Sequence, residues 1–434
     1  MMRKKLMAAT VGVAAGALVL SACSSGGGST DNPSGGDTTK PVVMELWQNS
    51  TTGDGQAYWN KMAADFHTKY PNVTINVTSI QNEDMDGKLQ TSLNTGDAPD
   101  IFMARGGGKL ADIVKAGLVM DLTGKLDANT ESTMKGALAA FTIDGKEYGV
   151  PTSVLPEGFF YSTDLFTAAG ITDVPKTIDD LSADAAKLKS SGGGGIAVGA
   201  KDAWPAAHWY YQFALRECSQ DTMNKSASTR TFDDDCWLRA GKDLEAFAAT
   251  KPFNDGFLTT SAQQGAGSSA GLVANHKAGM ELMGAWDPGV IASLTPDTQA
   301  LKDLASFPFP EISGGQGTPG AMLGGADGYS CHVNAPPECV TFLDFVATKT
   351  NQEQYATAFK TIPASVDAQG VVTDPSLTNL LTAYNNAPYV MLWLDTLYGQ
   401  NVGNALNVAV VNLLAGKGTP EDIVKAVNDA ALKG

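Results

Sequence analysis

Strand-like and helix-like segments alternate in the first part of the chain, and this order limits the fold class more than any other feature. Val42–Trp47 is a β-like run, and the apolar residues of Tyr58–Tyr70 recur at helical spacing. Val73–Thr78 alternates apolar and polar residues as a half-buried strand does, Lys88–Leu93 is helical, and Ile101–Met103 is a short apolar strand. Because this order is typical of a parallel sheet covered by helices, the sequence predicts an α/β fold.

The last predicted helix is marked by the residues around its first turn. Thr419 can serve as its N-cap, Pro420 takes the first helical position, and Asp422 adds a negative charge to the first turn. Ile423 and Val427 lie on one face of this helix. We expect the helix to pack through that face.

A basic and an apolar segment open the chain in the order typical of an export signal. Arg3–Lys5 precedes an apolar run that is too short for a comfortable membrane span. The run ends at Ala22 and is followed by Cys23, an arrangement that resembles the lipobox of bacterial lipoproteins. Residues 1–22 are therefore interpreted as a signal peptide. Lipidation of Cys23 with two acyl chains would give stable membrane anchoring.

Residues 23–40 are rich in glycine, serine and threonine and poor in apolar residues. Such a segment cannot bury enough apolar surface to fold, so we expect a lipid-anchored flexible tether. The folded body would then stand on the outer face of the cell membrane. The alternative is a soluble secreted protein in which Cys23 is incidental.

The length and the charge of the body limit both its architecture and its partners. The body begins near Pro41 and has roughly 390 residues, more than one hydrophobic core usually holds, so we expect two lobes. The chain has 46 acidic and 30 basic residues, a net charge of −16. This excess disfavours nucleic acid and other polyanions as partners, whereas a neutral ligand is compatible with it.

Four cysteines remain once Cys23 is assigned to the lipid. An even number in an exported protein indicates two disulfides, and three pairings are possible. Pairing of nearest neighbours is favoured, which joins Cys218 to Cys236 and Cys331 to Cys339. A zinc site is the alternative, but the sequence has no Cys-x-x-Cys motif and its four histidines are scattered.

Several short segments stand in the order and at the spacing found in one protein family. They are Leu46–Trp47, Ala98–Phe102, Gly149–Pro151, Phe160–Phe166 and Gly284–Trp286. Together they resemble the extracellular solute-binding proteins of the carbohydrate-importer class, the group that includes maltose-binding protein.

Further segments resemble one branch of that class, the xylobiose- and xylo-oligosaccharide-binding lipoproteins of actinobacterial ABC transporters. These segments are Gly284–Pro296, Gly325–Cys331, Pro337–Cys339 and Asp395–Asn407. Binders of α-galactosides such as raffinose-type sugars are near relatives, so they supply the alternative substrate.

The resemblance implies a two-lobed, periplasmic-binding-protein-like α/β fold with a hinge and a ligand cleft between the lobes. One lobe would comprise residues 41–152 and 310–362, the other residues 153–309 and 363–434, with hinge strands near Gly149–Pro151 and Pro310. The resemblance also implies binding without catalysis, an oligosaccharide ligand, ABC permease subunits as partners, and a monomer. No cofactor and no metal is expected.

A neutral sugar needs two kinds of protein surface. Its C–H faces lie against aromatic rings, and its hydroxyl groups need planar polar side chains. Because an unpaired buried polar group costs about 1–3 kcal/mol, the polar side chains decide which sugar is accepted. Aromatic and polar side chains that follow predicted strands are therefore the candidates.

Trp286 leads these candidates, because the resemblance aligns it with the stacking aromatic residue of the class. Asp287 beside it is expected to accept a hydrogen bond from a sugar hydroxyl. Trp204 and Trp209 flank His208 near a helix start, and one of the two tryptophans is expected to reach the ligand while the other packs. The alternatives are core packing for Trp286, a turn role for Asp287 and a structural role for His208.

The polar candidates include two aspartates on different segments. Asp327 lies among glycines, which permit a ligand to approach the backbone closely. Asp395 matches, through the resemblance, a position where relatives place a polar contact. The remaining candidates follow predicted strands or the expected hinge: Gln48, Asn49, Arg105 and Glu157, with Trp47 as a ring platform or as a core residue.

Enzyme motifs are weak in this chain. Gly267–Gly271 matches the nucleophile-elbow pattern, but no strong strand precedes it. Gly315–Gly320 matches a dinucleotide-binding pattern by spacing alone, without a surrounding βαβ unit. An exported glycoside hydrolase remains an alternative, because such an enzyme needs only two suitably placed carboxylates. A surface adhesin is a further alternative, although it would usually show repeats.

Overall fold

The computed structural model describes residues 40–51 and 53–433. The predicted signal peptide, Cys23 and residues 23–39 of the predicted tether lie outside the described residues. Within the described residues, no helix combines the length and the apolar character that crossing a membrane requires.

The strands are β1 (Val42–Gln48), β2 (Val73–Ser79), β3 (Ile101–Ala104), β4 (Thr142–Ile143), β5 (Lys146–Glu147), β6 (Val150–Ser162), β7 (Ile196–Ala197), β8 (Met280–Gly284), β9 (Leu304–Phe307), β10 (Met322–Cys331), β11 (Ile362–Pro363) and β12 (Val390–Leu392).

The α-helices are α1 (Gly53–Lys69), α2 (Asn82–Thr95), α3 (Gly107–Lys115), α4 (Ala128–Leu138), α5 (Thr163–Ala168), α6 (Ile178–Ser190), α7 (Trp204–Glu217), α8 (Gln220–Thr229), α9 (Asp235–Ala249), α10 (Ser269–Ala274), α11 (Asp287–Leu294), α12 (Glu338–Ala347), α13 (Lys349–Phe359), α14 (Pro375–Asn386), α15 (Leu394–Leu397), α16 (Gln400–Leu414) and α17 (Pro420–Ala431). Short 3₁₀ helices are η1 (Ala139–Phe141), η2 (Ala200–Asp202), η3 (Phe257–Thr259) and η4 (Val366–Val371).

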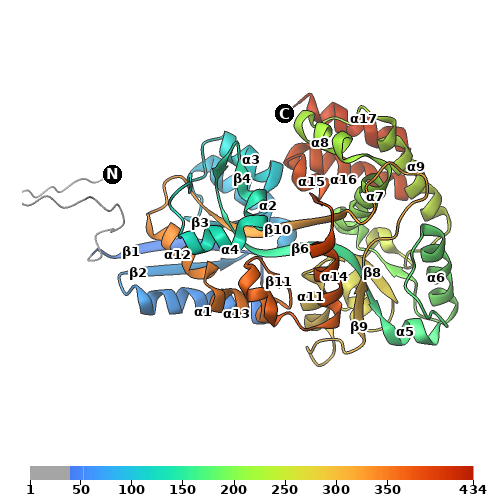
Figure 1. The fold of residues 1–434 in the computed structure, drawn as a ribbon, viewed down its shortest axis with the longest axis horizontal. Helices are drawn as coiled ribbons and strands as arrows, with labels where there is room; N and C mark the ends of the chain where they lie inside the picture. The colour runs from blue at the N-terminus through green and yellow to red at the C-terminus, as the bar shows by residue number, and fades with distance from the viewer. Residues whose placement is uncertain (1–39, 52, 434) are drawn as a thin grey trace, which may run out of the picture. The chain divides into compact units, whose positions relative to one another are not determined.

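The first lobe is built on the parallel strands β2, β1 and β3 (Figure 1). Helix α1 packs on this sheet through its apolar stripe, in which Trp59, Met62 and Phe66 are buried. Helix α12 contributes Phe342 to the same core. The sequence prediction of a parallel α/β arrangement in this region is therefore confirmed.

Two long strands link the first lobe to the second. The first half of β6 pairs with β10, and its second half pairs with β8 and β9. Strand β10 pairs with β3 at its end and with β12 at its start. One continuous path, β2-β1-β3-β10-β6-β8-β7, therefore runs through both lobes.

The second lobe has a large aromatic core between its sheet and helices α7, α9, α16 and α17. The ring of Trp209 is 1 % exposed and stacks on Phe247 at 5.1 Å between centroids. Helix α17 begins as the sequence predicts. Thr419 and Asp422 form a reciprocal capping box, and Ile423 and Val427 are fully buried.

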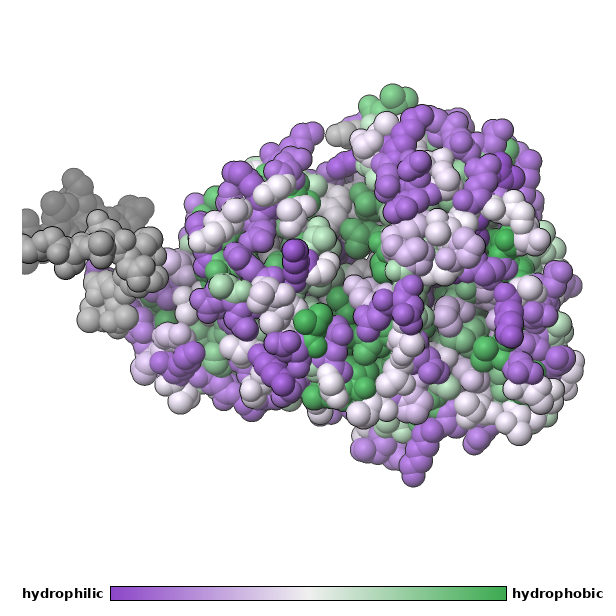
Figure 2. Space-filling model, in the orientation of Figure 1, coloured by the Kyte–Doolittle hydropathy of each residue, from purple (hydrophilic) through white to green (hydrophobic). Residues whose placement is uncertain are grey.

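Two disulfides are present, Cys218–Cys236 and Cys331–Cys339. This is the nearest-neighbour pairing favoured by the sequence. The first disulfide encloses helix α8 in the second lobe, and the second joins the end of β10 to α12 in the first lobe. On the face of the molecule in Figure 2, hydrophilic residues cover much of the surface, and hydrophobic residues gather mainly near the middle.

Candidate functional site

The candidate site is built on one face of the sheet where β6 and β10 link the lobes. In an antiparallel pair, residues directly opposite each other point to the same face, as do alternate residues of one strand. Ser153 lies opposite Asp327, and Leu155 lies opposite Gly325. Glu157, two residues further along β6, lies opposite Gly284 of β8. Asp327, Gly325, Glu157 and Gly284 therefore share one face.

The two glycines on this face make room for two tryptophan rings. A Cβ atom on Gly284 would lie 2.1 Å from Cζ3 of Trp286, and one on Gly325 would lie 2.2 Å from Cζ3 of Trp393. Both distances are far shorter than a normal contact, so a side chain at either position would displace the ring. The glycines thus allow the indoles to lie directly against the strands.

We call Trp204, His208, Trp286 and Trp393 the aromatic cluster. The ring centroids of Trp286 and Trp393 are 5.4 Å apart, and those of Trp204 and Trp286 are 5.9 Å apart. The ring of His208 lies nearly parallel to that of Trp393 at 5.3 Å. Each of the three indole N–H groups is buried and has no hydrogen-bond acceptor among the described residues, a costly arrangement in a protein interior.

Glu157 lies beneath the aromatic cluster. Its side chain is buried and hydrogen-bonds to Nδ1 of His208 through Oε1, while Nε2 of Gln212 donates to Oε2 at 2.7 Å. His208 and Gln212 both project from helix α7, four residues apart on one face. Glu157 and His208, both candidates from the sequence, are thus brought together by α7 and β6.

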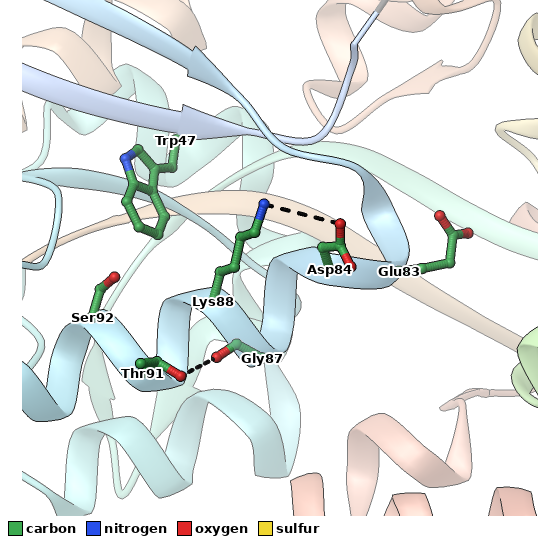
Figure 3. A pocket seen from close by; sticks show the side chains of 7 residues that line it. All are labelled: Trp47, Glu83, Asp84, Gly87, Lys88, Thr91 and Ser92. Atoms are coloured by element: carbon green, nitrogen blue, oxygen red, sulfur yellow. Dashed lines mark hydrogen bonds and ion pairs between the residues drawn. The ribbon is translucent and has the colours of Figure 1, made fainter.

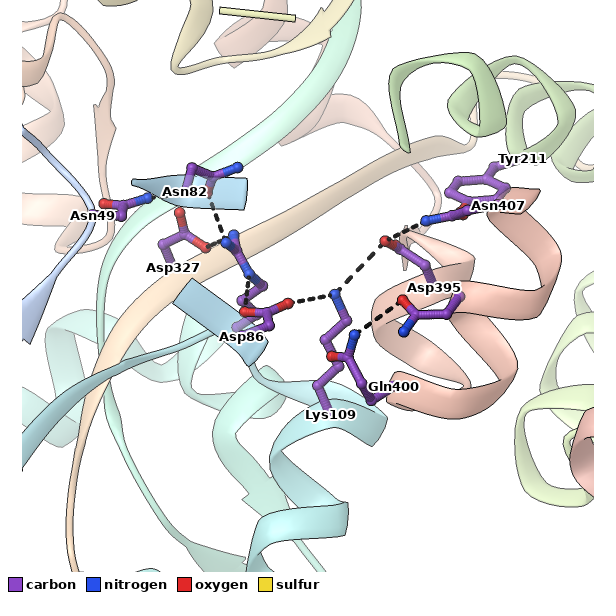
Figure 4. A network of polar contacts seen from close by, with 11 residues as sticks. Asn49, Asn82, Asp86, Lys109, Tyr211, Asp327, Asp395, Gln400 and Asn407 are labelled. Atoms are coloured by element: carbon purple, nitrogen blue, oxygen red, sulfur yellow. Dashed lines mark hydrogen bonds and ion pairs between the residues drawn. The ribbon is translucent and has the colours of Figure 1, made fainter. Parts of the chain in front are cut away.

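A second group of side chains lies beside this cluster, and we call Asp86, Arg105, Lys109, Asp327 and Asp395 the charged cluster (Figure 4). Arg105 donates from Nε to Asp86 at 3.1 Å, and its Nη1 lies 3.7 Å from Oδ1 of Asp327. Lys109 Nζ lies 3.0 Å from Asp86 and 3.7 Å from Asp395. The cluster joins α2, α3 and β10 to α15.

The charges of this cluster shift one another's pKa values. Burial alone would raise the pKa of Asp86, but Arg105 and Lys109 outweigh burial and hold it well below its usual range. Burial raises the pKa of Asp327, and the nearby Arg105 opposes this shift only in part. Three carboxyl groups face two cations, so the cluster has no surplus of positive charge.

Polar side chains continue from the charged cluster in two directions. Asn407 Nδ2 donates to Asp395 at 3.4 Å, and the hydroxyl of Tyr211 donates to Oδ1 of Asn407. On the other side, Arg105 Nη2 donates to Asn82 at 2.7 Å, and Asn49 donates to the same Asn82 oxygen at 3.3 Å (Figure 4). Asn49, Arg105, Asp327 and Asp395 from the sequence prediction therefore belong to one network.

A cavity of about 310 Å³ adjoins the charged cluster. Helices α2 and α3 line one side, and Arg230 with the first residues of α16 lines the other. Three members of the charged cluster, Asp86, Arg105 and Lys109, belong to its lining. Arg230 pairs with Asp112 of α3 at 2.8 Å, so contacts from both lobes enclose the cavity.

Four candidates from the sequence lie outside these two clusters and the polar side chains that adjoin them. Trp209 is packed in the core of the second lobe. Gln48 is buried and stabilises the loop that follows β1, because it donates to Ser79 and accepts from the backbone N–H of Ser50. Asp287 is fully buried beside Glu281, whose side chain points to the opposite sheet face from Gly284.

Trp47 lies over helix α2, where it lines a separate pocket (Figure 3). The other lining residues are all on α2, and they include the ion pair between Lys88 and Asp84. The Trp47 ring also packs against apolar residues of the first lobe. This pocket shares no lining residue with the aromatic or the charged cluster.

Several residues of the site did not stand out in the sequence. Trp393 follows the three-residue strand β12, and its position over Gly325 depends on pairing between strands distant in sequence. Asp86 and Lys109 lie inside helices, where charged residues are common and usually face solvent. One local signal could have drawn attention to Trp393. It is an aromatic residue two positions before Asp395, which is a candidate carboxylate.

The described part of the chain shows no metal-type cluster, and the serine of the nucleophile-elbow motif is buried. No group of three or more potential metal-ligating side chains occurs among residues 40–51 and 53–433. Ser269, in the Gly267–Gly271 motif, is fully buried and donates to the carbonyl oxygen of Ala262. It therefore has no exposed hydroxyl.

Several known proteins of similar sequence are named as binding proteins. An ABC transporter extracellular-binding protein of Pyrococcus horikoshii is 24% identical over 435 residues, which cover 95% of this chain and 93% of that protein. The diacetylchitobiose-binding protein DasA of Streptomyces coelicolor is 26% identical over 345 residues, which cover 75% of this chain and 73% of DasA.

A solved structure from work on xylan utilization by Caldanaerobius polysaccharolyticus has the same fold. It matches with a TM-score of 0.81 at 23% sequence identity, and the match covers 90% of this chain and 99% of that one. The two-lobed α/β fold expected from the sequence is therefore confirmed.

The profile of one family, the bacterial extracellular solute-binding proteins, matches residues 49–353. Members of this family bind solutes and are not enzymes, which removes the alternative of a glycoside hydrolase. The chain belongs to the bacterial extracellular solute-binding protein family.

Proposed function

We propose that this protein binds an uncharged oligosaccharide between the aromatic and the charged clusters and delivers it to the permease of an ABC importer. The preferred substrates are xylo- or arabinoxylo-oligosaccharides. The main support for this proposal is that three indole rings lie beside the same sheet face as a network of carboxylate, guanidinium and amide groups.

The aromatic cluster supports a saccharide ligand because indole faces suit the C–H surfaces of sugar rings. Trp204 and Trp286 are partly exposed, whereas Trp393 is 7 % exposed and packs edge-to-face against Trp286. Trp286 and Trp204 are therefore the proposed platforms.

The charged cluster supports a neutral rather than an anionic ligand. Its carboxylates outnumber its cations, so the cluster would repel an anionic ligand. Asp327, Arg105 and Asp395 offer the fixed acceptors and donors that sugar hydroxyls require. Asn49 extends this set at the edge of the network.

The relatives favour the same ligand class. DasA is named for binding diacetylchitobiose, and the Caldanaerobius structure comes from work on xylan utilization. The relative from Pyrococcus horikoshii is named as a component of an ABC transporter. These names, together with the site chemistry, favour sugar import as the role of this chain.

We further propose that ligand closes the two lobes about β6 and β10. The lobes are proposed to comprise residues 41–152 with 310–362 and residues 153–309 with 363–434. Because both clusters would contact the sugar only when the lobes approach, ligand should stabilise the closed form. A monomer, held to the outer face of the membrane through lipidated Cys23, would present this closed form to the permease.

A thermal-shift panel tests the proposed substrate. Xylo-, malto- and α-galacto-oligosaccharides are each added at increasing concentration, and a ligand that binds only the folded protein raises its apparent stability. The xylo-oligosaccharides should raise the midpoint most. A larger shift with raffinose would replace xylosides by α-galactosides, and no shift with any sugar would contradict the proposal.

A further inference from the structure

Glu157 stands at the residue where strand β6 changes partners. Its neighbour Pro156 pairs with Gly324 of β10, whereas Glu157 itself pairs with Gly284 of β8. The residues before it belong to the sheet shared with the first lobe, and those after it belong to the second lobe. A side chain at this position can therefore connect the linking strand to a helix of one lobe.

The carboxylate of Glu157 has its two hydrogen-bond partners on a single helix. His208 and Gln212, both on α7, each bind one of its oxygens. All three side chains are nearly inaccessible, with 1 % of Glu157, 3 % of His208 and 1 % of Gln212 exposed. A buried carboxylate that lost these partners would be strongly destabilised, so the contacts fix α7 against β6.

His208 links Glu157 to the tryptophans of the aromatic cluster. Its ring stacks on Trp393 and lies 5.1 Å from the ring of Trp204. Trp393 in turn contacts Trp286 at 5.4 Å. Because Glu157 and His208 are buried beneath these rings, neither offers an accessible surface for a sugar.

We infer that Glu157 and His208 are positioning residues that hold the three tryptophans of the aromatic cluster in the arrangement needed for sugar binding, rather than ligand contacts. This inference rests on the proposed function, because it assigns the cluster the role of sugar platform. Glu157 acts through His208, and His208 acts through Trp204 and Trp393.

Substitution of Glu157 separates positioning from direct contact. Glu157→Gln keeps an oxygen that accepts from His208. Gln212 can rotate its amide so that its Oε1, which has no hydrogen-bond partner among the described residues, accepts from the new NH2 group. Affinity for the best oligosaccharide of the panel should therefore stay within two-fold. Glu157→Ala removes the acceptor, and affinity should fall about five- to ten-fold. The near-ultraviolet circular dichroism of the sugar-free protein, which reports on closely spaced indoles, should change in Glu157→Ala and not in Glu157→Gln.

Glu217 provides the matched control. It is a buried glutamate at the other end of α7, where its carboxylate binds Arg239 rather than an aromatic ring. Glu217→Gln should leave both the spectrum and the affinity unchanged. If Glu157→Ala does not fold, Gln212→Leu removes one partner of the same carboxylate, and it should alter the spectrum and weaken affinity two- to three-fold.

Two results would overturn the inference. Equal loss of affinity in Glu157→Gln and Glu157→Ala, with an unchanged spectrum, would make the carboxylate a direct ligand contact. Unchanged spectrum and affinity in Glu157→Ala, or in Gln212→Leu where that variant is used, would deny any positioning role. Failure of the wild-type protein to bind any sugar would contradict the proposed function alone, since the sugar-free spectra still test the positioning.

Discussion

At the scale of single residues, the least expected finding concerns Asp287. The sequence placed it beside the stacking tryptophan as a hydroxyl acceptor, yet it is fully buried next to the equally buried Glu281. Among the described residues, no cationic side chain contributes to the pKa shift of either carboxyl group, so nothing offsets their burial. Burial raises the pKa of Asp287 from 3.8 to about 7, and burial together with Asp287 raises the pKa of Glu281.

This pair predicts how stability depends on pH. A carboxyl group with a raised pKa binds its proton more tightly in the folded state, so its contribution is complete below roughly pH 4 and is lost as the pH rises through about 7. Asp287→Asn should flatten this decline in thermal-unfolding midpoints and stabilise the protein at neutral pH. Exposed Asp164→Asn is the control, and identical pH profiles for wild type and Asp287→Asn would contradict the assignment.

Trp286 gives the second prediction at this scale. Its ring is partly exposed and lies against Gly284, so its removal deletes a platform without emptying the core. Trp286→Ala should weaken oligosaccharide binding by about 1–3 kcal/mol in a calorimetric titration. Trp47→Ala, which lies over a separate pocket, should leave affinity unchanged. An unaltered affinity in Trp286→Ala would remove this ring from the site.

At the scale of strands and helices, the site depends on glycine at two strand positions. Gly325→Ala would place a Cβ atom 2.2 Å from the ring of Trp393, so the ring must move. We expect this variant to lose affinity and to unfold at a lower temperature. Gly136→Ala is the matched control, because Gly136 lies within α4 with no atom within 4 Å of the added Cβ.

The control variant should become slightly more stable, by about 0.5–1 kcal/mol, because alanine favours a helix more than glycine does. The account of Gly325 would be contradicted if Gly325→Ala bound sugar as tightly as the wild type and unfolded at the same temperature.

Elements with strong local signals could be predicted from the sequence. Helix α17 was expected from Thr419, Pro420 and Asp422, and its capping box and buried face are present. Helix α2 was predicted only over Lys88–Leu93 but spans Asn82–Thr95, because its polar first turn carries no apolar periodicity. Short strands such as β12 had no local signal, since pairing with β10 rather than propensity defines them.

At the scale of the whole molecule, the order of elements predicted a parallel α/β sheet and the family resemblance implied the two-lobed fold, but neither predicted the full site. Asp327 and Arg105 could be proposed from their positions among glycines or after a strand, and Asp395 from the family resemblance. These residues contact Asp86 and Lys109 only because α2, α3 and α15 pack together. That packing cannot be predicted from a local sequence pattern. Trp209 is a candidate from the sequence that the structure places in the core, and its spacing on α7 suits either a ligand platform or a core residue.

Closure of the lobes is the prediction at this scale. Small-angle scattering should show a smaller radius of gyration when a xylo-oligosaccharide is bound. Contacts such as Arg230 with Asp112 and Gln264 with Glu83 already join the lobes and would contribute to the closed form. An unchanged radius of gyration with a tightly bound sugar would contradict the closure mechanism. The location of the binding site is tested by the substitutions described above.

The most direct test of the central claim is a crystal structure of the protein with a bound xylo-oligosaccharide. We predict one sugar ring against the face of Trp286, with its hydroxyl groups within hydrogen-bonding distance of Arg105 or Asp327. A sugar bound elsewhere, with the three indoles still packed only against protein, would contradict the account.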